Sequence, residues 1–289
     1  MIFSLFEIFY ESGYKIFAIM SIKLIKGGKL RIVRFAVQGE VKYGVLEGNV
    51  LHGLLDSPFS KFREPGSPFP LDGTSYKLNE VKLLAPCIPS KIVCLGLNYH
   101  SHAEELKQPV PAVPLIFFKP PSAVIGPDDE IILPRFSKRV DYEGELGVVI
   151  GSKTKDVPED KTKDYVLGYT CFNDVTERYI QKEDGQWSRC KGFDTFAPMG
   201  PWVETEVEPD DLKLETYLNG ELRQSTRTSD FIFKVARLVS FISGVMTLLP
   251  GDVIATGTTS GIGRMNPGDV VEVSIEKIGT LRNFVVSQK

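Results

Sequence analysis

Three carboxylates on two segments of the sequence have the residue types and the spacing of a divalent-cation site. Glu143 and Glu145 lie in RVDYEGELGVVIG, and Asp174 lies in GYTCFNDVTERYIQ. Mg²⁺ and Mn²⁺ prefer oxygen ligands and keep open positions for water or substrate, so two neighbouring carboxylates need only one more from elsewhere in the fold. We therefore predict a metal site formed by Glu143, Glu145 and Asp174.

The segment that carries the two glutamates alternates with the period of a β-strand. Asp141, Glu143 and Glu145 occupy every second position. A strand of this kind points both glutamates to one face, roughly 6.5 to 7 Å apart. Two ordinary interpretations stay open, because acidic residues on strands are commonly solvated and because Asp174 and Glu177 have the spacing of a helix capping box.

A candidate general base follows the strand KIVCLGLNY. His102 and Glu105 are three residues apart in HSHAEEL and share a face if this segment forms a helical turn. Histidine titrates near neutral pH, and a neighbouring carboxylate fixes its tautomer and raises its basicity, as activation of water or abstraction of a carbon-bound proton requires. An exposed pair on a short surface helix has the same spacing and is the alternative.

Residues downstream of Asp174 could contact a substrate. Arg178 and Gln181 follow it at spacings of four and three. On one helix, this spacing places a guanidinium and an amide beside the metal-directed carboxylate, where they could hold a substrate carboxylate or an enolate oxygen. Simple pairing of Arg178 with Asp174 across one helical turn fits the spacing equally well.

Two loops supply the remaining candidates. Lys191 lies in SRCKGFDTFAPMGP, where a desolvated ammonium could polarise a carbonyl or neutralise a carboxylate. In IATGTTSGIG, glycines allow close approach of the backbone to a ligand, and Thr256 and Thr258 offer hydroxyl groups. This segment lacks the spacing of a nucleotide-binding loop. A solvated lysine and a tight turn without a ligand are the alternatives.

The elements that must position these residues are many short strands and few helices. The sequence predicts strands in KIVCLGLNYH, LIFFKPPSAVIG, DEIILP, DYVLGYTCFN, KLETYLNG, GDVIATG, DVVEVSIEKIG and TLRNFVVS, and helices over residues 175–181 and 231–248. This proportion favours a predominantly β, α+β fold over a Rossmann or barrel architecture.

The first 80 residues differ from the rest. Residues 31–55 have the alternation of a β-meander, and residues 56–75 are rich in Pro, Ser and Gly, as in a linker. The apolar residues before Met20 are interrupted by charged ones and are too mixed for a membrane span. We predict an N-terminal extension over residues 1–20, a small β-rich domain with its linker over residues 21–80, and a catalytic domain over residues 81–289.

Composition limits the class of protein. The 34 Lys and Arg against 37 Asp and Glu give a net charge of −3, without the basic block typical of nucleic-acid binding. The four cysteines show neither CxxC spacing nor the density of a disulfide scaffold. We therefore predict a cytoplasmic protein with a small-molecule substrate, and neither nucleic acid nor a membrane as its partner.

Several segments together resemble the fumarylacetoacetate hydrolase family. In order along the chain they are LNYHSHAEE, FFKPPSAVIGP, RVDYEGELGVVIG, GYTCFNDVTERYIQ, WSRCKGFDTFAPMGP, LNGELRQ, MTLLPGDVIATGTTSGIG and VVEVSIEKIGTL, and they cover about residues 85–289. The resemblance implies a mixed β-sandwich roll and a homodimer. His100 and Thr259 depart from the common pattern, which bears on substrate preference rather than on the metal site.

The resemblance also implies the roles of particular residues. It implies a Mg²⁺ or Mn²⁺ ion bound by Glu143, Glu145 and Asp174, although an all-oxygen site also admits Ca²⁺. It assigns catalysis to the residues that match His102, Glu105 and Lys191, and it places those that match Arg178, Gln181 and Thr258 in the substrate pocket.

Within this family, the chain most resembles 2-hydroxyhepta-2,4-diene-1,7-dioate isomerases and acylpyruvate hydrolases. Their common physical step is chelation of a 2-oxo or 2-enol carboxylate by the metal, which stabilises an enolate. We predict a hydrolase of a C–C bond in an acylpyruvate or another β-diketo acid, in which His102, oriented by Glu105, activates water and Lys191 stabilises the leaving enolate. A hydroxymuconate-type isomerase, an oxaloacetate decarboxylase or tautomerase, and a catalytically silent metal-binding homologue are the alternatives.

Overall fold

The computed structural model describes residues 2–6, 21–25, 30–60 and 67–289. In these residues most of the regular structure is β-strand, arranged in three sheets, and the helices are short. The predicted α+β, predominantly β fold class is confirmed. No helix in the described ranges is long and apolar enough to cross a bilayer.

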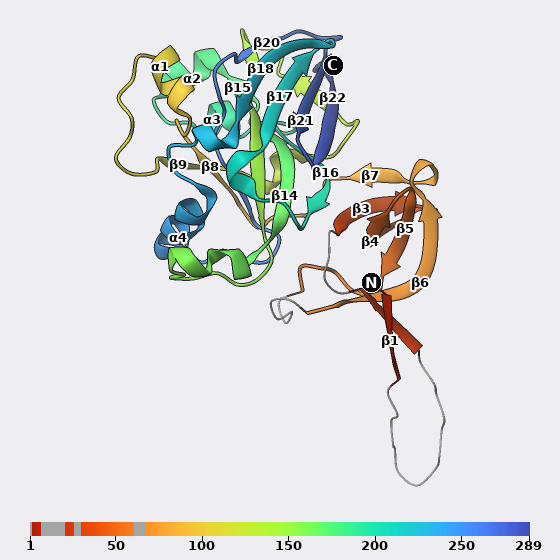
Figure 1. Cartoon of the computed structure of the whole chain (residues 1–289). Helices are drawn as coiled ribbons and strands as arrows, with labels where there is room; N and C mark the ends of the chain where they lie inside the picture. Colours follow the sequence, from red (N-terminus) through yellow and green to blue (C-terminus); the bar gives the residue numbers. More distant parts are fainter. Residues whose placement is uncertain (1, 7–20, 26–29, 61–66) are drawn as a thin grey trace.

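The largest sheet has 14 strands and extends through the whole molecule (Figure 1). Its strands are β1 Ile2–Phe6, β2 Ser21–Ile25, β3 Arg31–Val37, β4 Glu40–Glu47, β5 Val50–Leu54, β6 Phe69–Lys77, β7 Lys82–Leu84, β8 Ile92–Leu95, β9 Ile116–Lys119, β10 Val124–Ile125, β13 Gly144–Ile150, β14 Val166–Asn173, β16 Ala197–Glu204 and β19 Val253–Ala255. The order across the sheet is β1-β2-β6-β5-β4-β3-β16-β14-β13-β19-β8-β9, with β7 paired to β3 and β10 paired to β16.

Two smaller sheets complete the β structure. One contains β11 Glu130–Leu133, β22 Gly279–Ser287, β21 Val270–Ile275, β17 Lys213–Leu218 and β18 Glu221–Arg227, in that order. The other contains β15 Thr176–Glu177, β12 Val140–Tyr142 and β20 Gly263–Met265. The five-stranded sheet packs on the large sheet, since Val273, Ile275 and Leu281 share one apolar cluster with Leu146 and Val148.

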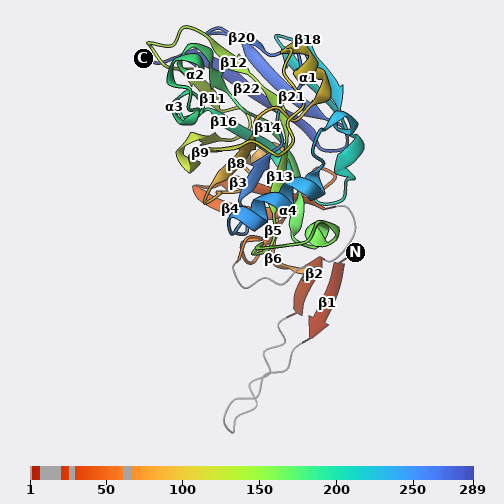
Figure 2. The ribbon, with the colours of Figure 1, turned by 90° about the vertical axis from the view of Figure 1, so that its left-hand side faces the viewer.

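The helices are α1 His100–Glu105, α2 Arg178–Asp184, α3 Ser188–Lys191 and α4 Val235–Val245, and short 3-10 turns occupy Leu78–Glu80, Pro121–Ala123, Glu159–Asp164, Pro209–Asp211 and Thr228–Asp230. Helices α1, α2 and α3 lie at the end of the molecule opposite β1 and β2, in both views (Figures 1 and 2). The apolar face of α4 packs on the large sheet through Leu238, Val239 and Ile242.

Strand β13 is buried on both faces. Leu146, Val148 and Ile150 contact the cluster that includes α4, while Val149 belongs to a second cluster on the opposite face. Every residue of β13 is buried. A carboxylate on this strand, such as that of Glu145, therefore needs a compensating partner, because an isolated buried charge is strongly disfavoured.

The N-terminal strands share a core with the rest of the chain. Ile32, Val45 and Leu54 lie in the same apolar cluster as Met199 and Val203 of β16. Strand β3 also pairs with β16, with Ile32 opposite Val203. The described strands before residue 80 are therefore joined to the remainder through a continuous sheet, and β3, β4 and β5 also through side-chain packing.

The structure corrects the end of the predicted linker over residues 56–75, from Phe69 onward. Strand β6 begins at Phe69 and pairs with β5, with Leu71 opposite Leu54 and Ser75 opposite His52. Phe69 is buried in the core, which explains why a segment rich in Pro and Gly is nevertheless extended and ordered there. Of the predicted N-terminal extension, Ile2–Phe6 pairs with β2, and the rest lies outside the described residues.

Both predicted helices have different bounds in the structure. Helix α4 begins at Val235 rather than near residue 231, because Asn98 accepts hydrogen bonds from the backbone N–H groups of Ile232 and Phe233. It ends at Val245, and Leu248 forms a bridge with Thr154 instead. Strands β16 and β18 were absent from the predicted elements.

Candidate active site

A cavity of about 610 Å³ lies between α1, α2, α3 and the connection from β12 to β13 that carries Glu143. Its polar wall is formed by His102, Gln108, Arg139, Asp141, Glu143, Arg178, Tyr179, Gln181, Lys182, Lys191 and Thr258, and its apolar wall by Leu95, Gly96, Leu97, Leu106, Phe117, Trp187 and Ile262. A small organic acid with an apolar part fits such a lining, since polar groups fix orientation and apolar ones bury the remainder.

The three predicted metal ligands form one buried cluster. Ligand oxygens of Glu143, Glu145 and Asp174 all lie within 4.8 Å of one another. The antiparallel pairing of β13 with β14 brings them together, because Gly144 lies opposite Asn173 and the Asp174 N–H donates to the Glu143 carbonyl at 2.9 Å. The predicted arrangement of the two glutamates on one continuous strand is only approximate, since β12 ends at Tyr142 and β13 begins at Gly144.

Two buried lysines neutralise part of this cluster. The Lys191 ammonium donates to Glu143 at 2.7 Å and to Asp174 at 2.6 Å. The Lys119 ammonium, from β9, donates to the other oxygen of Asp174 at 2.5 Å and to the Val175 carbonyl at 3.0 Å. Lys191 is the last residue of α3 rather than part of the predicted loop, and its ammonium lies 5.0 Å from the centre of the Phe117 ring.

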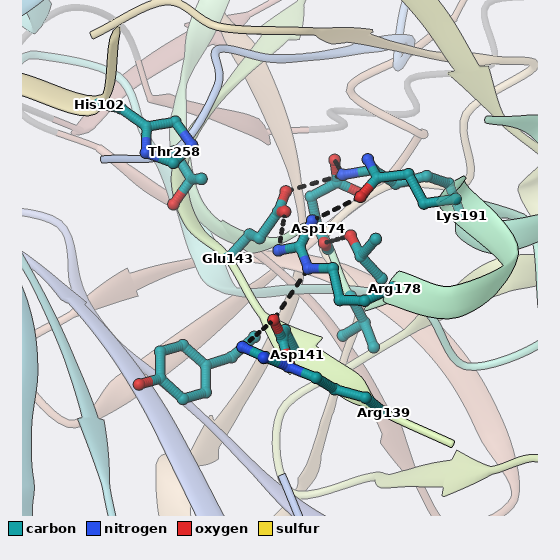
Figure 3. Close-up of polar contacts among 12 residues, drawn as sticks. His102, Arg139, Asp141, Glu143, Asp174, Arg178, Lys191 and Thr258 are labelled. Atoms are coloured by element: carbon teal, nitrogen blue, oxygen red, sulfur yellow. Dashed lines mark hydrogen bonds and ion pairs between the residues drawn. The ribbon is translucent and has the colours of Figure 1, made fainter. Parts of the chain in front are cut away.

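Arg178 contacts the carboxylates next to this cluster. Its guanidinium donates to Asp141 at 2.9 Å, to Gln181 at 3.0 Å and to Glu143 (Figure 3). Asp141 also pairs with Arg139, at 2.8 and 3.1 Å. The alternative in which Arg178 pairs with Asp174 across one helical turn is therefore wrong, and so is the prediction that Asp174 shares a helix with Arg178 and Gln181.

The start of α2 explains this correction. Residues Thr176–Glu177 pair with β12, so the helix begins only at Arg178 and Asp174 precedes it. Glu177 caps the helix by accepting from the Ile180 N–H at 2.5 Å, and it also accepts from the N–H groups of Lys138 and Arg139. The Asp174 carboxylate is thus free of a capping role and faces the two lysines.

The charges in the cluster shift its pKa values in opposite directions. Burial alone would raise the pKa of Glu143, but Lys191 and Arg178 outweigh burial and lower it to about 2. For Glu145, burial and then the neighbouring Asp174 and Glu143 raise the pKa well above its ordinary value. Its carboxylate accepts from the Gly257 N–H at 2.8 Å. Glu145 is therefore the carboxylate with the least compensation.

A divalent cation fits the residues present. Three buried carboxylates with converging oxygens are the hard ligands that Mg²⁺, Mn²⁺ and Ca²⁺ prefer. Such an ion would also supply positive charge beside Glu145, where the protein's own cations supply least.

The predicted contact between His102 and Glu105 is present in the structure. His102 is buried in α1 and lines the cavity, and its Nδ1 lies 2.8 Å from a carboxylate oxygen of Glu105. The other oxygen of Glu105 accepts from the Gly261 N–H at 3.4 Å. Because Nδ1 is engaged by Glu105, Nε2 is the ring nitrogen left for chemistry in the cavity.

Thr258 lines the cavity, and its hydroxyl already makes two hydrogen bonds within the protein. It donates to the Gly144 carbonyl at 2.9 Å and accepts from Gln224 at 2.9 Å. A hydroxyl has one hydrogen, so Thr258 can only accept a hydrogen bond from a ligand. Thr256 donates to the Leu146 carbonyl and lies outside the cavity lining.

The structure brings all nine predicted site residues into one region. In Figure 3, Glu143 and Asp174 lie between His102 and Thr258 on one side and Lys191 on the other. Two charged residues of the site, Lys119 and Asp141, were not predicted as site residues from the sequence. An ionisable residue at the end of the apolar run IFFK, and a third acid in register with the two glutamates, were the signals that could have found them.

Comparisons with protein families match two parts of the chain. Residues 91–286 match the model described as fumarylacetoacetate (FAA) hydrolase C-terminal, and residues 30–86 match the model described as Rv2993c-like, N-terminal. Among similar proteins, one from Archaeoglobus fulgidus is 56% identical over 225 residues, which is 78% of this chain and 90% of that protein. Protein Rv2993c of Mycobacterium tuberculosis is 44% identical over 267 residues, which is 89% of this chain and 98% of that protein.

Solved structures agree with this match. A 5-carboxymethyl-2-hydroxymuconate delta-isomerase from Mycobacterium smegmatis has a TM-score of 0.83 at 44% identity, over 89% of this chain and 100% of that chain. A 2-hydroxyhepta-2,4-diene-1,7-dioate isomerase from Mycobacterium marinum has a TM-score of 0.82 at 44% identity, over 90% and 99%. A maleylpyruvate hydrolase from Sphingobium sp. SYK-6, in complex with manganese(II) and pyruvate, has a TM-score of 0.73 at 29% identity, over 90% and 100%.

These matches confirm the predicted family resemblance and the fold that it implies. The family model spans more than half of the chain, and the relatives are aligned over nearly their whole length. The protein belongs to the fumarylacetoacetate hydrolase family.

Proposed function

We propose that this protein is a divalent-metal-dependent hydrolase that cleaves a C–C bond in an acylpyruvate or another β-diketo acid. The observation that carries the proposal is that Glu143 of the carboxylate cluster and His102 of the His102–Glu105 pair line the same cavity. The similarity to a maleylpyruvate hydrolase whose structure contains manganese and pyruvate supports both the metal and a pyruvate-forming reaction.

Glu143, Glu145 and Asp174 would hold the ion, which we propose to be Mg²⁺ or Mn²⁺. When bound, such an ion acts as a Lewis acid toward the oxygens of a 2-oxo carboxylate. Lys191 contributes a fixed positive charge at the same end of the cavity, because its buried ammonium contacts two of the three carboxylates. Burial alone would lower the pKa of Lys191, but Asp174 and Glu143 outweigh burial and raise it, so the lysine stays charged.

His102 is the proposed general base. Glu105 holds the imidazole through Nδ1, which leaves Nε2 to take a proton from water. The hydroxide left from that water adds to the distal carbonyl carbon, the C–C bond breaks to give a carboxylic acid and the enolate of pyruvate, and the enolate carbon takes the proton back from His102 to become the methyl group of pyruvate. Arg178 and Gln181 contact each other at the edge of the cavity and are proposed to orient the substrate carboxylate.

Isomerisation of a hydroxymuconate-type acid is the second candidate. The mycobacterial proteins named as isomerases are more similar to this chain than the maleylpyruvate hydrolase is. In that reaction His102 would carry a proton between two carbon atoms and water would not be consumed.

An assay with three substrates separates these candidates. Acetylpyruvate, oxaloacetate and a 2-hydroxymuconate analogue are each incubated with the protein and Mg²⁺, and products are followed by absorbance and by pyruvate detection. We expect acetylpyruvate to yield acetate and pyruvate in equal amounts. Turnover of the muconate analogue alone, without pyruvate, would favour the isomerase, and inactivity on all three would refute an enzyme of this class.

A further inference from the structure

Gln224 is a buried amide that connects the five-stranded sheet to the metal end of the site. It lies on β18 and is 1% exposed. Its Oε1 accepts from the Gly144 N–H at 3.0 Å, and its Nε2 donates to the Thr258 hydroxyl at 2.9 Å and to the Thr259 carbonyl at 3.0 Å. Both amide hydrogens and the carbonyl oxygen of this side chain are therefore used within the site.

The residue that Gln224 holds is the one between the two glutamates. The Gly144 N–H donates to Gln224, and the Gly144 carbonyl accepts from Thr258. A side chain at this position has no room, because a Cβ atom on Gly144 would lie 2.1 Å from the Thr216 hydroxyl and 3.3 Å from Gln224 Oε1. Small movements of this peptide would displace the carboxylates on both sides of it.

The same amide holds the loop that supports Glu145. In this loop the Gly257 N–H donates to the Glu145 carboxylate, and the next two residues, Thr258 and Thr259, contact Gln224. One side chain thus fixes both the peptide that carries the glutamates and the loop that orients one of them.

The contacts continue to the element that carries the base. The Thr259 hydroxyl lies 3.2 Å from the Ser101 hydroxyl, and Ser101 precedes His102 in α1. Ser101 is held in turn by Asp230, which accepts from its N–H at 3.1 Å and from its hydroxyl at 2.7 Å.

We propose that Gln224 is a positioning residue, which sets the geometry of the Glu143–Glu145 pair and of the Thr258 loop without contacting the metal or the substrate. The proposal rests on the carboxylate site described above and adds to it a residue from another sheet. Removing a group that hydrogen-bonds to the metal ligands and orients them, without binding the metal itself, typically weakens metal binding about 10- to 100-fold.

The test compares two buried amides of the same sheet. Gln224→Met keeps the length of the side chain and removes its hydrogen bonds. The control is Asn283→Leu, because Asn283 on β22 is also 1% exposed and donates to the Gly126 and Asp129 carbonyls, away from the cavity. The dissociation constant for Mn²⁺ is measured from the electron paramagnetic resonance signal of the free ion, and the midpoint temperature of unfolding is measured on the same samples.

We expect both substitutions to lower the unfolding temperature, and Gln224→Met alone to weaken Mn²⁺ binding, by about 10- to 100-fold. Wild-type Mn²⁺ affinity in Gln224→Met, or an equal loss in Asn283→Leu, would overturn the positioning role. If Gln224→Met does not fold, Gln224→Glu takes its place. This variant retains an acceptor for the Gly144 N–H and loses the two donors to Thr258 and Thr259, so a measurable loss of Mn²⁺ affinity relative to the wild type is expected. Absence of Mn²⁺ binding by the wild-type protein would instead refute the proposed metal site.

Discussion

Among the three carboxylates of the cluster, Glu145 has the least positive charge beside it. It is 1% exposed, and burial together with Asp174 and Glu143 raises its pKa well above the ordinary value. Glu143 and Asp174 each contact buried cations, whereas the hydrogen bond found for Glu145 comes from a neutral backbone N–H. The site therefore stores unfavourable electrostatic energy at the position where a divalent cation would act.

Replacing Glu145 by Gln should separate stability from metal binding. The amide keeps an acceptor for the Gly257 N–H and removes a buried, poorly compensated carboxylate. We expect the metal-free variant to unfold a few degrees higher than the wild type, corresponding to about 1 kcal/mol, and to lose the increase in unfolding temperature that Mg²⁺ gives the wild type. Calorimetry with and without Mg²⁺ measures both effects, and a variant that still responds to Mg²⁺ would contradict the assignment.

Lys119 provides a second test at this scale. Its ammonium is buried and pairs with Asp174, so removal of the charge leaves a buried carboxylate short of a partner. We expect Lys119→Met to lower the free energy of unfolding by about 3 to 5 kcal/mol. Lys82→Met is the control, since Lys82 is 62% exposed in its pair with Asp129 and an exposed pair contributes less than about 1 kcal/mol. Equal losses of unfolding free energy in the two variants, measured by urea unfolding, would show that the buried Lys119 pair contributes no more than an exposed pair.

At the scale of elements, the site depends on how strands β8, β13, β14 and β19 are held together. Asp252 joins two of them, because it lies directly before β19 and its buried carboxylate accepts from the backbone N–H groups of Ser90 at 2.9 Å, Lys91 at 3.2 Å and Leu249 at 2.8 Å. The parallel pairing of Val253 with Ile92 follows immediately.

We expect Asp252→Ala to cost about 3 kcal/mol or more, because it removes a buried carboxylate that accepts hydrogen bonds from three backbone N–H groups. Urea unfolding measures this, with Asp156→Ala as the control, since Asp156 is 67% exposed in its pair with Lys155. A loss below about 1 kcal/mol, the scale of one ordinary hydrogen bond, would mean that water replaces these contacts.

The elements that depend only on residues close together in the sequence were predicted from local patterns. The turn of α1 with His102 and Glu105, and the strand that carries Glu145, follow from spacing and alternation in a few residues. The start of α2 could not be predicted in this way, because it depends on pairing of Thr176 with Asp141 on another strand.

Long-range partners explain the other omissions. Lys119 is 55 residues from Asp174, and Gln224 is 80 residues from Gly144. In the sequence the first is a lysine that ends an apolar run and the second is a polar residue in LNGELRQ, and neither segment contains the group that it contacts. Their roles become visible only when the sheets are assembled.

At the scale of the whole molecule, the described β-rich N-terminal strands and the region that matches the hydrolase family are one packed body. Strand β3 extends the large sheet beside β16, and Ile32 and Val45 lie in a cluster with Phe172 and Val203. The predicted boundary near residue 81 stays a prediction, because it passes between strands that share this core.

Deletion of residues 1–80 tests that boundary. We expect the remaining chain to aggregate or to unfold at a markedly lower temperature, since the deletion exposes one edge of β16 and the apolar side chains packed beneath it. Deletion of residues 1–20 is the control, because in the described residues it removes only β1, the outermost strand of the sheet. Size-exclusion chromatography and thermal unfolding compare the two, and a well-folded 81–289 fragment would contradict the expectation. The same chromatography, with light scattering, tests the homodimer that we propose from the family.

A crystal of the protein soaked with Mn²⁺ and oxalate tests the central claim most directly, because the anomalous signal of manganese locates the ion and oxalate mimics a 2-oxo carboxylate. We expect one manganese ion bound by Glu143, Glu145 and Asp174, with oxalate on its open positions and His102 facing the free end of the cavity. An ion bound elsewhere, or oxalate bound in the cavity with no metal beside the three carboxylates, would contradict the account.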